Sequence, residues 1–322
     1  MIARSHASRL PIAIASRLSL PLIVAPMFSV SGVELVTAVC QSGAIGAFPT
    51  INARSVEELD HWLTCIKQDL AKPDRVAAPH CPNLLMRQAR MKDDLACLVR
   101  HKAEIVITSM GSPTAAIGPL HEIGCLVFTD IASLHHAENA LKAGADGLIL
   151  LTAGAGGHTG WANPFAFVRA VRTMFDGPIV LAGGITDGAS LAAARLLGCD
   201  LAYMGTRFIA TLESMASITY RRMLVDSTLD DIILTRAFTG LPVNMLRPSI
   251  VATGLDPSTL DETVSETRAK QIFGGNPGEG PRRWFDVLSA GHAVSGVRSI
   301  MGAGELVQQV AAQYRATLAN CV

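Results

Sequence analysis

The sequence predicts an α/β protein built as a (β/α)8 TIM barrel, with a mostly helical insertion after the eighth strand. Eight short apolar runs alternate with longer stretches of helical spacing, and such runs are typical of strands buried on both faces. The length of 322 residues suits a barrel with one insertion. Apolar residues make up 49% of the chain and charged residues 17%, which is enough material for a large core. An open doubly wound sheet is the alternative arrangement of these elements.

The strands and helices of the barrel are expected from apolar runs, spacing and caps. The expected strands cover residues 20–25, 44–48, 75–79, 104–108, 124–128, 146–151, 178–182 and 200–204. The expected helices between them include 55–70, 132–143 and 187–197. Ser55, with Glu58 three residues later, forms a capping-box pattern at the start of the first. Asp187 is the expected N-cap of the third, and Gly198 is its expected C′ residue.

The alternation of strands and helices breaks after residue 212. Helical spacing is present at 213–226 and at 229–236, and a Pro/Gly-rich passage then runs from Pro242 to Pro281. A final helical pattern at 304–319 could complete the eighth βα unit. We therefore expect a barrel formed by residues 1–212 with 300–322, and an insertion of residues 213–299 over its C-terminal mouth. A lid and a dimerisation arm are both natural roles for that insertion, so a homodimer is the one macromolecular assembly to expect.

Composition argues against several classes of protein. Lys+Arg and Asp+Glu both total 27, and a nucleic-acid-binding protein should instead show a basic stripe. The seven cysteines are odd in number and never spaced as CxxC, which argues against a disulfide framework or a metal site. No apolar stretch approaches the ~20 residues that span a bilayer, so no membrane partner is expected. The N-terminal arginines resemble a presequence, but LPLIVAPMF (20–28) is better explained as the first strand. A cytoplasmic enzyme is expected.

The strongest chemical signal is the glycine loop after the sixth expected strand. His158 is the only ionisable side chain between Leu148 and Gly160. The glycines at 154, 156, 157 and 160 let the backbone approach another group closely, because they carry no Cβ. Barrel enzymes keep their catalytic residues at the C-terminal ends of the strands, so His158 is the candidate catalytic residue. The alternative is an ordinary strand-to-helix turn with a surface histidine.

Two further glycine turns follow the seventh and eighth expected strands. They are LAGGIT (181–186) and MGTRF (204–208). In TIM barrels these loops commonly bind a phosphate through main-chain N–H groups. Neither contains a lysine, so the phosphate would be held by amides and the Thr206 hydroxyl. The alternative is two tight turns that pack helices onto strands.

Several other motifs are incomplete. HHAEN (135–139) contains the His-Ala-Glu of zinc deaminases, but no PCxxC follows it. GAGGHTG has Thr159 where a dinucleotide fingerprint requires its third glycine. The chain has no GxSxG elbow and no HExxH helix. A hydrolase, a zinc enzyme and a Rossmann dehydrogenase are therefore disfavoured, and no metal is expected.

Eight segments, in this order, together resemble the nitronate monooxygenases, which were once called 2-nitropropane dioxygenases. They are IVAPMF (23–28), GAIGAFPT (43–50), PNLL (82–85), VITSMG (106–111), GADGLILLTAGAGGHTG (144–160), GPIVLAGGI (177–185), DLAYMGTRFIAT (200–211) and VLSAGHAVSGV (287–297). The AGGHTG, AGGI and MGTRF elements are the specific ones, whereas APM and SAG mean little alone. The resemblance runs from about residue 18 to near the C-terminus and implies an FMN-dependent barrel enzyme.

The resemblance also implies roles for individual residues. Main-chain groups of Pro26, Met27 and Phe28 would line the edge of the flavin ring, and Asn83 would hydrogen-bond the ring. The FMN phosphate would be cradled by Gly183, Gly184, Gly205 and Thr206. Ala155, Gly156 and Gly157 would keep the loop thin enough for ring contact. His158 would face the substrate over the flavin, as a hydrogen-bond donor to an anionic nitronate or as the base for a neutral nitroalkane.

The implied reaction is oxidation of an alkyl nitronate, such as propionate 3-nitronate, by O2 to a carbonyl product and nitrite. The closest alternative is a related FMN barrel that reduces an enoyl thioester with NAD(P)H, and a non-catalytic barrel is the alternative from another class. Two departures bear on substrate size and charge. His292 follows SAG where many relatives carry glutamine, and 239–249 lacks a polar-aromatic pair that relatives often place near the pocket.

Overall fold

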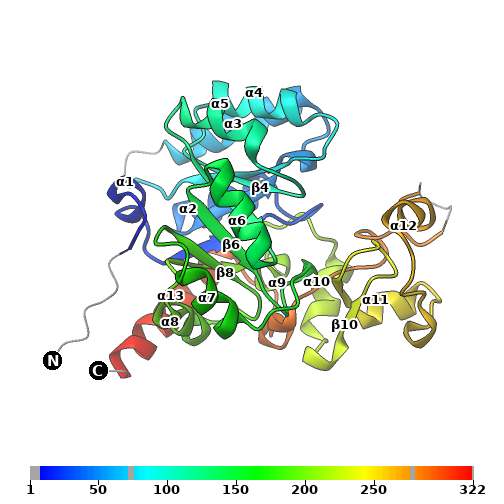
Figure 1. Cartoon of the computed structure of the whole chain (residues 1–322). Coiled ribbons are helices and arrows are strands. Elements are labelled where there is room, and N and C mark those ends of the chain that lie inside the picture. Colours follow the sequence, from blue (N-terminus) through cyan, green and yellow to red (C-terminus); the bar gives the residue numbers. More distant parts are fainter. Residues whose placement is uncertain (1–7, 72–75, 276–279, 321–322) are drawn as a thin grey trace.

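Eight parallel strands form a closed barrel in the computed structural model, which describes residues 8–71, 76–275 and 280–320 (Figure 1). The barrel strands are β1 (Leu22–Val24), β2 (Ile45–Pro49), β3 (His80–Leu85), β4 (Ile105–Ser109), β5 (Leu126–Ile131), β6 (Gly147–Leu151), β8 (Ile179–Ala182) and β9 (Leu201–Met204). Each strand pairs with the next, and β9 returns to pair with β1. The predicted TIM barrel is confirmed, and the open sheet is wrong.

A helix follows each barrel strand and covers its outer face. These helices are α2 (Val33–Gln41), α3 (Val56–Leu70), α4 (Met91–Arg100), α5 (Thr114–His121), α6 (Leu134–Ala143), α7 (Pro164–Arg172), α8 (Gly188–Leu197) and α13 (Ala303–Asn320). The last helix lies against α8 and α2, so it closes the ring between the eighth and first units. The helix expected at 304–319 is therefore present and completes the eighth βα unit.

Caps explain where two of these helices begin. The Asp187 side chain accepts a hydrogen bond from the Ser190 N–H, and Gly198 ends α8 in the left-handed region at φ 106°. At the start of α3, the Ser55 hydroxyl accepts from the Glu58 N–H. The Glu58 carboxylate accepts from the N–H of Arg54, one residue before the cap. The predicted N-caps are confirmed. The capping box at α3 is incomplete, because Glu58 accepts from the N–H of Arg54 and not from that of Ser55.

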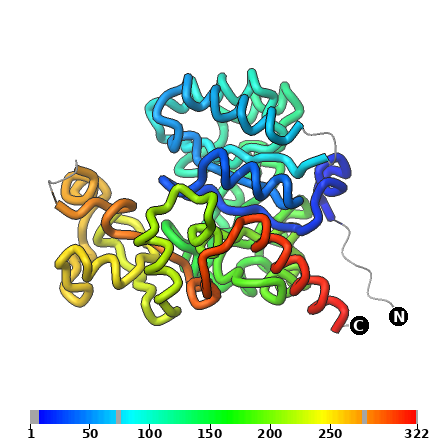
Figure 2. The backbone as a smooth tube through the Cα atoms, turned by 180° about the vertical axis from the view of Figure 1, so that it is seen from behind, coloured from blue at the N-terminus to red at the C-terminus, as the bar shows by residue number. Residues whose placement is uncertain are grey.

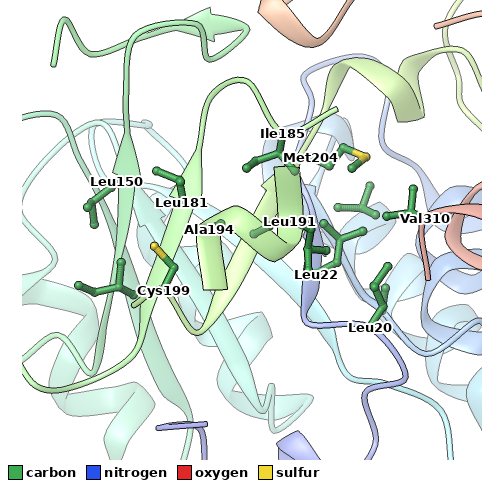
Figure 3. Close-up of a cluster of buried hydrophobic side chains, with 14 of the residues drawn as sticks. Leu20, Leu22, Leu150, Leu181, Ile185, Leu191, Ala194, Cys199, Met204 and Val310 are labelled. Carbon is green, nitrogen blue, oxygen red and sulfur yellow. The ribbon is translucent and has the colours of Figure 1, made fainter. Parts of the chain in front are cut away.

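The apolar core has two layers, one inside the barrel and one between the barrel and its helices. Figure 3 shows part of the outer layer, where Leu22 and Met204 from the strands meet Leu191 of α8 and Val310 of α13. Side chains from every barrel strand fill the interior. Leu10 and Ile14, beside and within the short helix α1 (Ile12–Ala15), pack against this interior cluster.

A buried ion-pair network lies at the start of β9. The Asp200 carboxylate is fully buried and accepts hydrogen bonds from Arg172 Nη2 at 2.6 Å and from the Ile179 N–H at 3.0 Å. Its other oxygen accepts from the Arg9 N–H at 2.9 Å. The carboxylate therefore links α7, β8 and the N-terminal segment. Over the described ranges, no helix has the length and apolar character to cross a bilayer.

Two strand positions differ from the prediction. The expected strand at 75–79 is wrong: residue 75 lies outside the described residues, 76–79 form no strand, and β3 begins at His80, which pairs with Gly46. The run VAAP (76–79) is apolar, but none of its residues pairs with β2. The strand itself contains Pro82, and proline argues against a strand in the sequence. The expected strand at 124–128 begins later and runs on to Ile131, because its pairing with β6 continues there.

The insertion forms a lobe beside the barrel, coloured yellow to orange in Figure 2. It contains α10 (Ile218–Val225), β10 (Ile232–Thr235), β11 (Val243–Leu246), α11 (Arg247–Ala252) and α12 (Glu266–Phe273). The helix expected at 229–236 is wrong, since 232–235 is a strand antiparallel to β11. The helix expected at 213–226 is present only from Ile218. A third strand, β7 (Gly157–His158), joins this sheet from the barrel loop.

Candidate active site

A single cavity of about 1520 Å³ brings together all twelve residues for which the sequence predicted a site role. They are Pro26, Met27, Phe28, Asn83, Ala155, Gly156, Gly157, His158, Gly183, Gly184, Gly205 and Thr206. The cavity lies at the C-terminal ends of the barrel strands, where barrel enzymes place their active sites. It exceeds the roughly 300–1,000 Å³ of a typical small-molecule site, so it has room for a cofactor together with a substrate.

The bottom of this cavity, which we call the floor, is formed by one residue from the end of each barrel strand. The floor residues are Ala25, Pro49, Asn83, Ser109, Asp130, Leu151, Ala182 and Tyr203. On every strand, the residue two positions earlier belongs to the barrel interior. Because strand side chains alternate with a period of two, the floor residues point inward as well. The floor therefore carries polar groups on top of an apolar core.

His158 is held by the insertion as well as by the barrel. It lies on β7, and its Cα partner is Val243 of β11. Its imidazole meets the Trp284 ring edge-to-face, with ring centroids 5.7 Å apart. Burial lowers the pKa of His158, the Arg283 guanidinium lowers it further, and Glu266 opposes both. A neutral imidazole at pH 7 can donate one N–H and accept one proton, which suits both roles expected from the sequence.

The loop that carries His158 is packed directly against a second loop from the end of the insertion. A Cβ on Gly156 would lie 2.8 Å from the Gly291 nitrogen, and a Cβ on Gly291 would lie 2.6 Å from the Gly154 oxygen. The His292 N–H donates to that same oxygen at 2.9 Å. Asn244 of β11 donates from Nδ2 to the Ala155 oxygen at 2.7 Å. The two loops touch backbone to backbone, which only glycine permits.

The His292 side chain does not line the cavity. It is exposed, and its ring covers Gly154, where an added Cβ would be 2.7 Å from Nδ1. His292, which stands where many relatives carry glutamine, therefore packs against the loop at Gly154 and does not enter the cavity.

The two glycine turns leave the sheet side by side, because Ala182 of β8 pairs with Tyr203 of β9. Gly183 and Gly184 have φ of 115° and 74°, and a Cβ on Gly184 would meet nothing within 4 Å. Among the described residues, the N–H groups of Gly184, Gly205 and Thr206 donate no hydrogen bond. The Thr206 hydroxyl accepts from the Gly291 N–H at 2.9 Å, which leaves its proton free to donate. Donors of this kind suit an anion, and the phosphate site stays a prediction.

Two of the predicted ring-contact residues already form hydrogen bonds with other residues. The Met27 N–H donates to the Ser31 hydroxyl, and its carbonyl accepts from Asn52 Nδ2 at 2.9 Å. The Met27 main chain is therefore occupied, and its thioether instead lies beside Gly205. Asn83 Oδ1 accepts from the Ser109 hydroxyl at 2.9 Å, so its amide NH2 is the part left to bind a ligand.

The insertion supplies the outer wall of the cavity. Its lining includes four charged side chains, Glu266, Lys270, Arg282 and Arg283, and four aromatic ones, Tyr220, Phe273, Trp284 and Phe285. Arg282 is paired with Asp286 and lies 4.9 Å from the centre of the Phe285 ring. With Asp286 counted beside Arg282, the wall carries three cations against two carboxylates, and this net positive charge favours an anionic ligand.

Sequence reasoning missed two parts of the site. Asp130 lies on the floor, and a carboxylate that ends the apolar run LVFTD was a signal for it. Gly291 belongs to the SAG motif, which is too short to be informative alone, and only the contact with Gly154 and Gly156 reveals its importance.

Comparison with known proteins agrees with this geometry. The model of the nitronate monooxygenase family matches residues 12–313. A nitronate monooxygenase of Paraburkholderia phytofirmans is 30% identical over 278 residues, covering 74% of this chain and 76% of the relative. A (3aS,4S,5R,7aS)-5-hydroxy-7a-methyl-1-oxo-octahydro-1H-indene-4-carboxyl-CoA dehydrogenase of Mycobacterium tuberculosis is 28% identical over 237 residues, covering 72% of this chain and 64% of that protein.

Two solved structures resemble the fold over nearly the whole chain. FabK from Thermotoga maritima matches with a TM-score of 0.81 and 24% identity, covering 98% of both chains. Nitroalkane oxidase from Streptomyces ansochromogenes matches with a TM-score of 0.79 and 24% identity, covering 96% of this chain and all of the other. At this identity the two structures support the barrel fold alone.

Proposed function

Because the chain belongs to the nitronate monooxygenase family, we propose that it is an FMN-dependent oxidoreductase that oxidises alkyl nitronates with O2 to a carbonyl product and nitrite. Propionate 3-nitronate is one substrate of this class. The observation that carries the proposal is that His158 and both glycine turns face one cavity large enough for two ligands. The two turns suit a phosphate, and the histidine suits a small anion beside it.

FMN would supply the electron-transfer chemistry, which no protein side chain provides. The residues present fit it in two respects. The N–H groups of Gly184, Gly205 and Thr206 have no acceptor in the part of the chain that the structure describes, and they can hold the phosphate. The NH2 group of Asn83, on the floor, donates no hydrogen bond within the described ranges and would bind the ring, with the main chain of Pro26 and Phe28 at the ring's edge.

The chain's own residues would bind and orient the substrate. A nitronate is anionic, and the cations of the insertion wall attract it toward His158. The neutral imidazole donates its N–H to a nitronate oxygen or accepts the α-proton of a neutral nitroalkane. Trp284 packs edge-to-face against the ring and so limits the orientations that it can adopt.

The test is the absorbance spectrum of the purified protein, followed by nitrite release from a panel of nitronates with and without O2. We expect a bound flavin and nitrite release that requires O2. A flavin-loaded protein that releases no nitrite from any nitronate would contradict the proposed reaction. A protein that takes up no FMN would contradict the cofactor and support a non-catalytic barrel.

A second candidate is flavin-dependent redox chemistry on a thioester substrate, with NAD(P)H as the reductant in the enoyl-reductase version. The outer wall favours it, since Lys270, Arg282 and Arg283 could meet the phosphates of a carrier such as coenzyme A. The name of the Mycobacterium tuberculosis relative points to the same class. Anaerobic bleaching of the flavin by NAD(P)H would support this candidate, and bleaching by a nitronate alone would support the first.

A further inference from the structure

Asp130 is a carboxyl group on the floor of the cavity whose Oδ1 is enclosed and has no hydrogen-bond partner among the described residues. It lies one residue before the end of β5, and its Cα partner on β6 is Ile149. The residue two positions earlier, Phe128, is in the barrel interior, so the Asp130 side chain points inward. A buried polar atom without a hydrogen-bond partner is costly unless a ligand satisfies it.

The groups that face Asp130 carry no positive charge. Its titratable neighbours inside the barrel are Tyr203 on β9 and Cys81 on β3, and both interact electrostatically with it. Within the described part of the chain, no Lys, Arg or His forms an ion pair with it. Burial raises the pKa of Asp130 to about 7. The group is therefore neutral below neutral pH, and a neutral carboxyl can donate a hydrogen bond.

We propose that Asp130 is a further cofactor-binding residue, whose neutral carboxyl group donates a hydrogen bond to an acceptor atom of the flavin ring resting on the floor. This inference rests on the proposed function, because it takes FMN as the ligand of the cavity.

The flavin is favoured over the nitronate by the layout of the cavity. Asp130 is on the barrel side, with Asn83 and Tyr203, whereas His158 and the cationic wall are on the loop and insertion side. A flat ring lying between these two sides contacts the floor, and the substrate contacts His158. Ring carbonyl oxygens and nitrogens accept hydrogen bonds, so a neutral acid complements them and a carboxylate repels them.

This placement makes FMN affinity depend on pH in a defined direction. The neutral acid binds the ring, so affinity is highest below the pKa of Asp130 and falls as pH rises through about 7. Loss of one hydrogen bond corresponds to a change of about 3- to 10-fold in the dissociation constant.

The experiment is equilibrium dialysis of the FMN-loaded protein at about pH 6 and about pH 8.5, with flavin fluorescence as the readout. The variants are Asp130→Asn, which keeps a neutral donor of the same shape, and Asp130→Leu, which removes every polar atom. Asp176→Asn is the control, because Asp176 is exposed and does not line the cavity. The FMN phosphate also titrates in this range, but it does so equally in all four proteins.

For each protein we compare the FMN dissociation constant at the higher pH with that at the lower pH. We expect this ratio to be about 3- to 10-fold larger for the parent protein and the control than for Asp130→Asn. Asp130→Asn should match the parent at low pH, and Asp130→Leu should bind weakly at both. At the lower pH the parent protein should show the infrared band of a protonated carboxylic acid at Asp130, and Asp130→Asn should lack this band. Equal pH dependence of FMN binding in the parent and Asp130→Asn would overturn the inference.

The failures of the two proposals are distinguishable. FMN binding with the expected Asp130 dependence but without nitrite release would remove only the proposed reaction. Nitrite release with FMN binding that is indifferent to Asp130 would remove only the role of Asp130.

Discussion

An alanine at Gly291 would place a methyl group inside the contact between the two loops that carry the site. Its Cβ would lie 2.6 Å from the Gly154 oxygen and 2.7 Å from the Gly156 nitrogen. Both are main-chain atoms, so no side chain can rotate away. Reaching an ordinary contact of 3.4 Å from 2.6 Å requires the loops to separate by about 0.8 Å. Gly291 has φ of −97°, so alanine adds no backbone strain of its own.

The consequences follow from that displacement. Overpacking of this kind costs about 1 to 3 kcal/mol of stability. A shift approaching 1 Å beside a reacting group can cost about 10²-fold in rate. We therefore expect Gly291→Ala to lower the turnover of nitronate by up to about 10²-fold, while FMN is retained.

The assay pairs thermal unfolding with nitrite release, and Gly302→Ala is the matched control. A Cβ on Gly302 would find its nearest neighbour, Glu213 Oε1, at 3.6 Å, which is an ordinary contact. If Gly291→Ala equalled Gly302→Ala in both stability and turnover, loop-to-loop packing would not position His158, and the reasoning would be refuted.

Four other changes test separate parts of the molecule. His158→Ala should lower nitronate turnover by about 10²- to 10⁴-fold and leave FMN bound, as measured by nitrite release and flavin absorbance; full activity would remove its role. Gly184→Ala should weaken FMN binding by about 1 to 3 kcal/mol and riboflavin binding less in dialysis, since the methyl group would occupy phosphate space and alanine is strained at φ 74°. Asp200→Ala should lower the free energy of unfolding in urea by about 3 to 5 kcal/mol, because Arg172 is left buried and unpaired. Burial lowers the pKa of His80 to about 4, below its unfolded value near 6.5, so only the unfolded state gains a proton between these values. Stability should therefore fall by about 3 kcal/mol as pH drops from 7 to 4, and His80→Leu should flatten this part of the pH profile of urea unfolding.

The barrel was predictable because buried parallel strands leave apolar runs that are separated by helical spacing. The exception is β3, whose sequence HCPNLL places Pro82 and Asn83 in a strand. Proline is disfavoured within sheets, so the apolar run before it was the more attractive choice. The register is set by pairing with β2, where Pro82 lies opposite Phe48.

The insertion was less predictable because short strands depend on partners that are distant in sequence. The residues IILT of β10 suit a helix or a strand until β11 is placed beside them. The two-residue strand β7 has no sequence signal of its own and exists only through Val243 and Asn244.

The parts of the candidate site built from glycine loops could be predicted, because glycines mark places where the backbone lies close to another group. The parts that depend on side-chain packing could not be predicted from the sequence. The three glycine loops and His158 follow predicted strands, so their convergence follows from barrel topology. Asp130 was missed because a carboxylate at the end of a strand has no distinctive spacing. Its significance comes from the enclosure of one carboxyl oxygen that has no hydrogen-bond partner among the residues the structure describes.

The pairing of β7 with β11 bears on how this scaffold can acquire new specificity. His158 belongs to the three-stranded sheet of the insertion, through its pairing with Val243. Exchanging the whole insertion for that of another barrel would therefore also change the orientation of the imidazole. Grafts that preserve Val243 and Asn244 should tolerate wide variation at the outer wall, where Lys270 and Arg282 stand. Substitutions in the outer wall can then change substrate selectivity while the position of His158 is preserved.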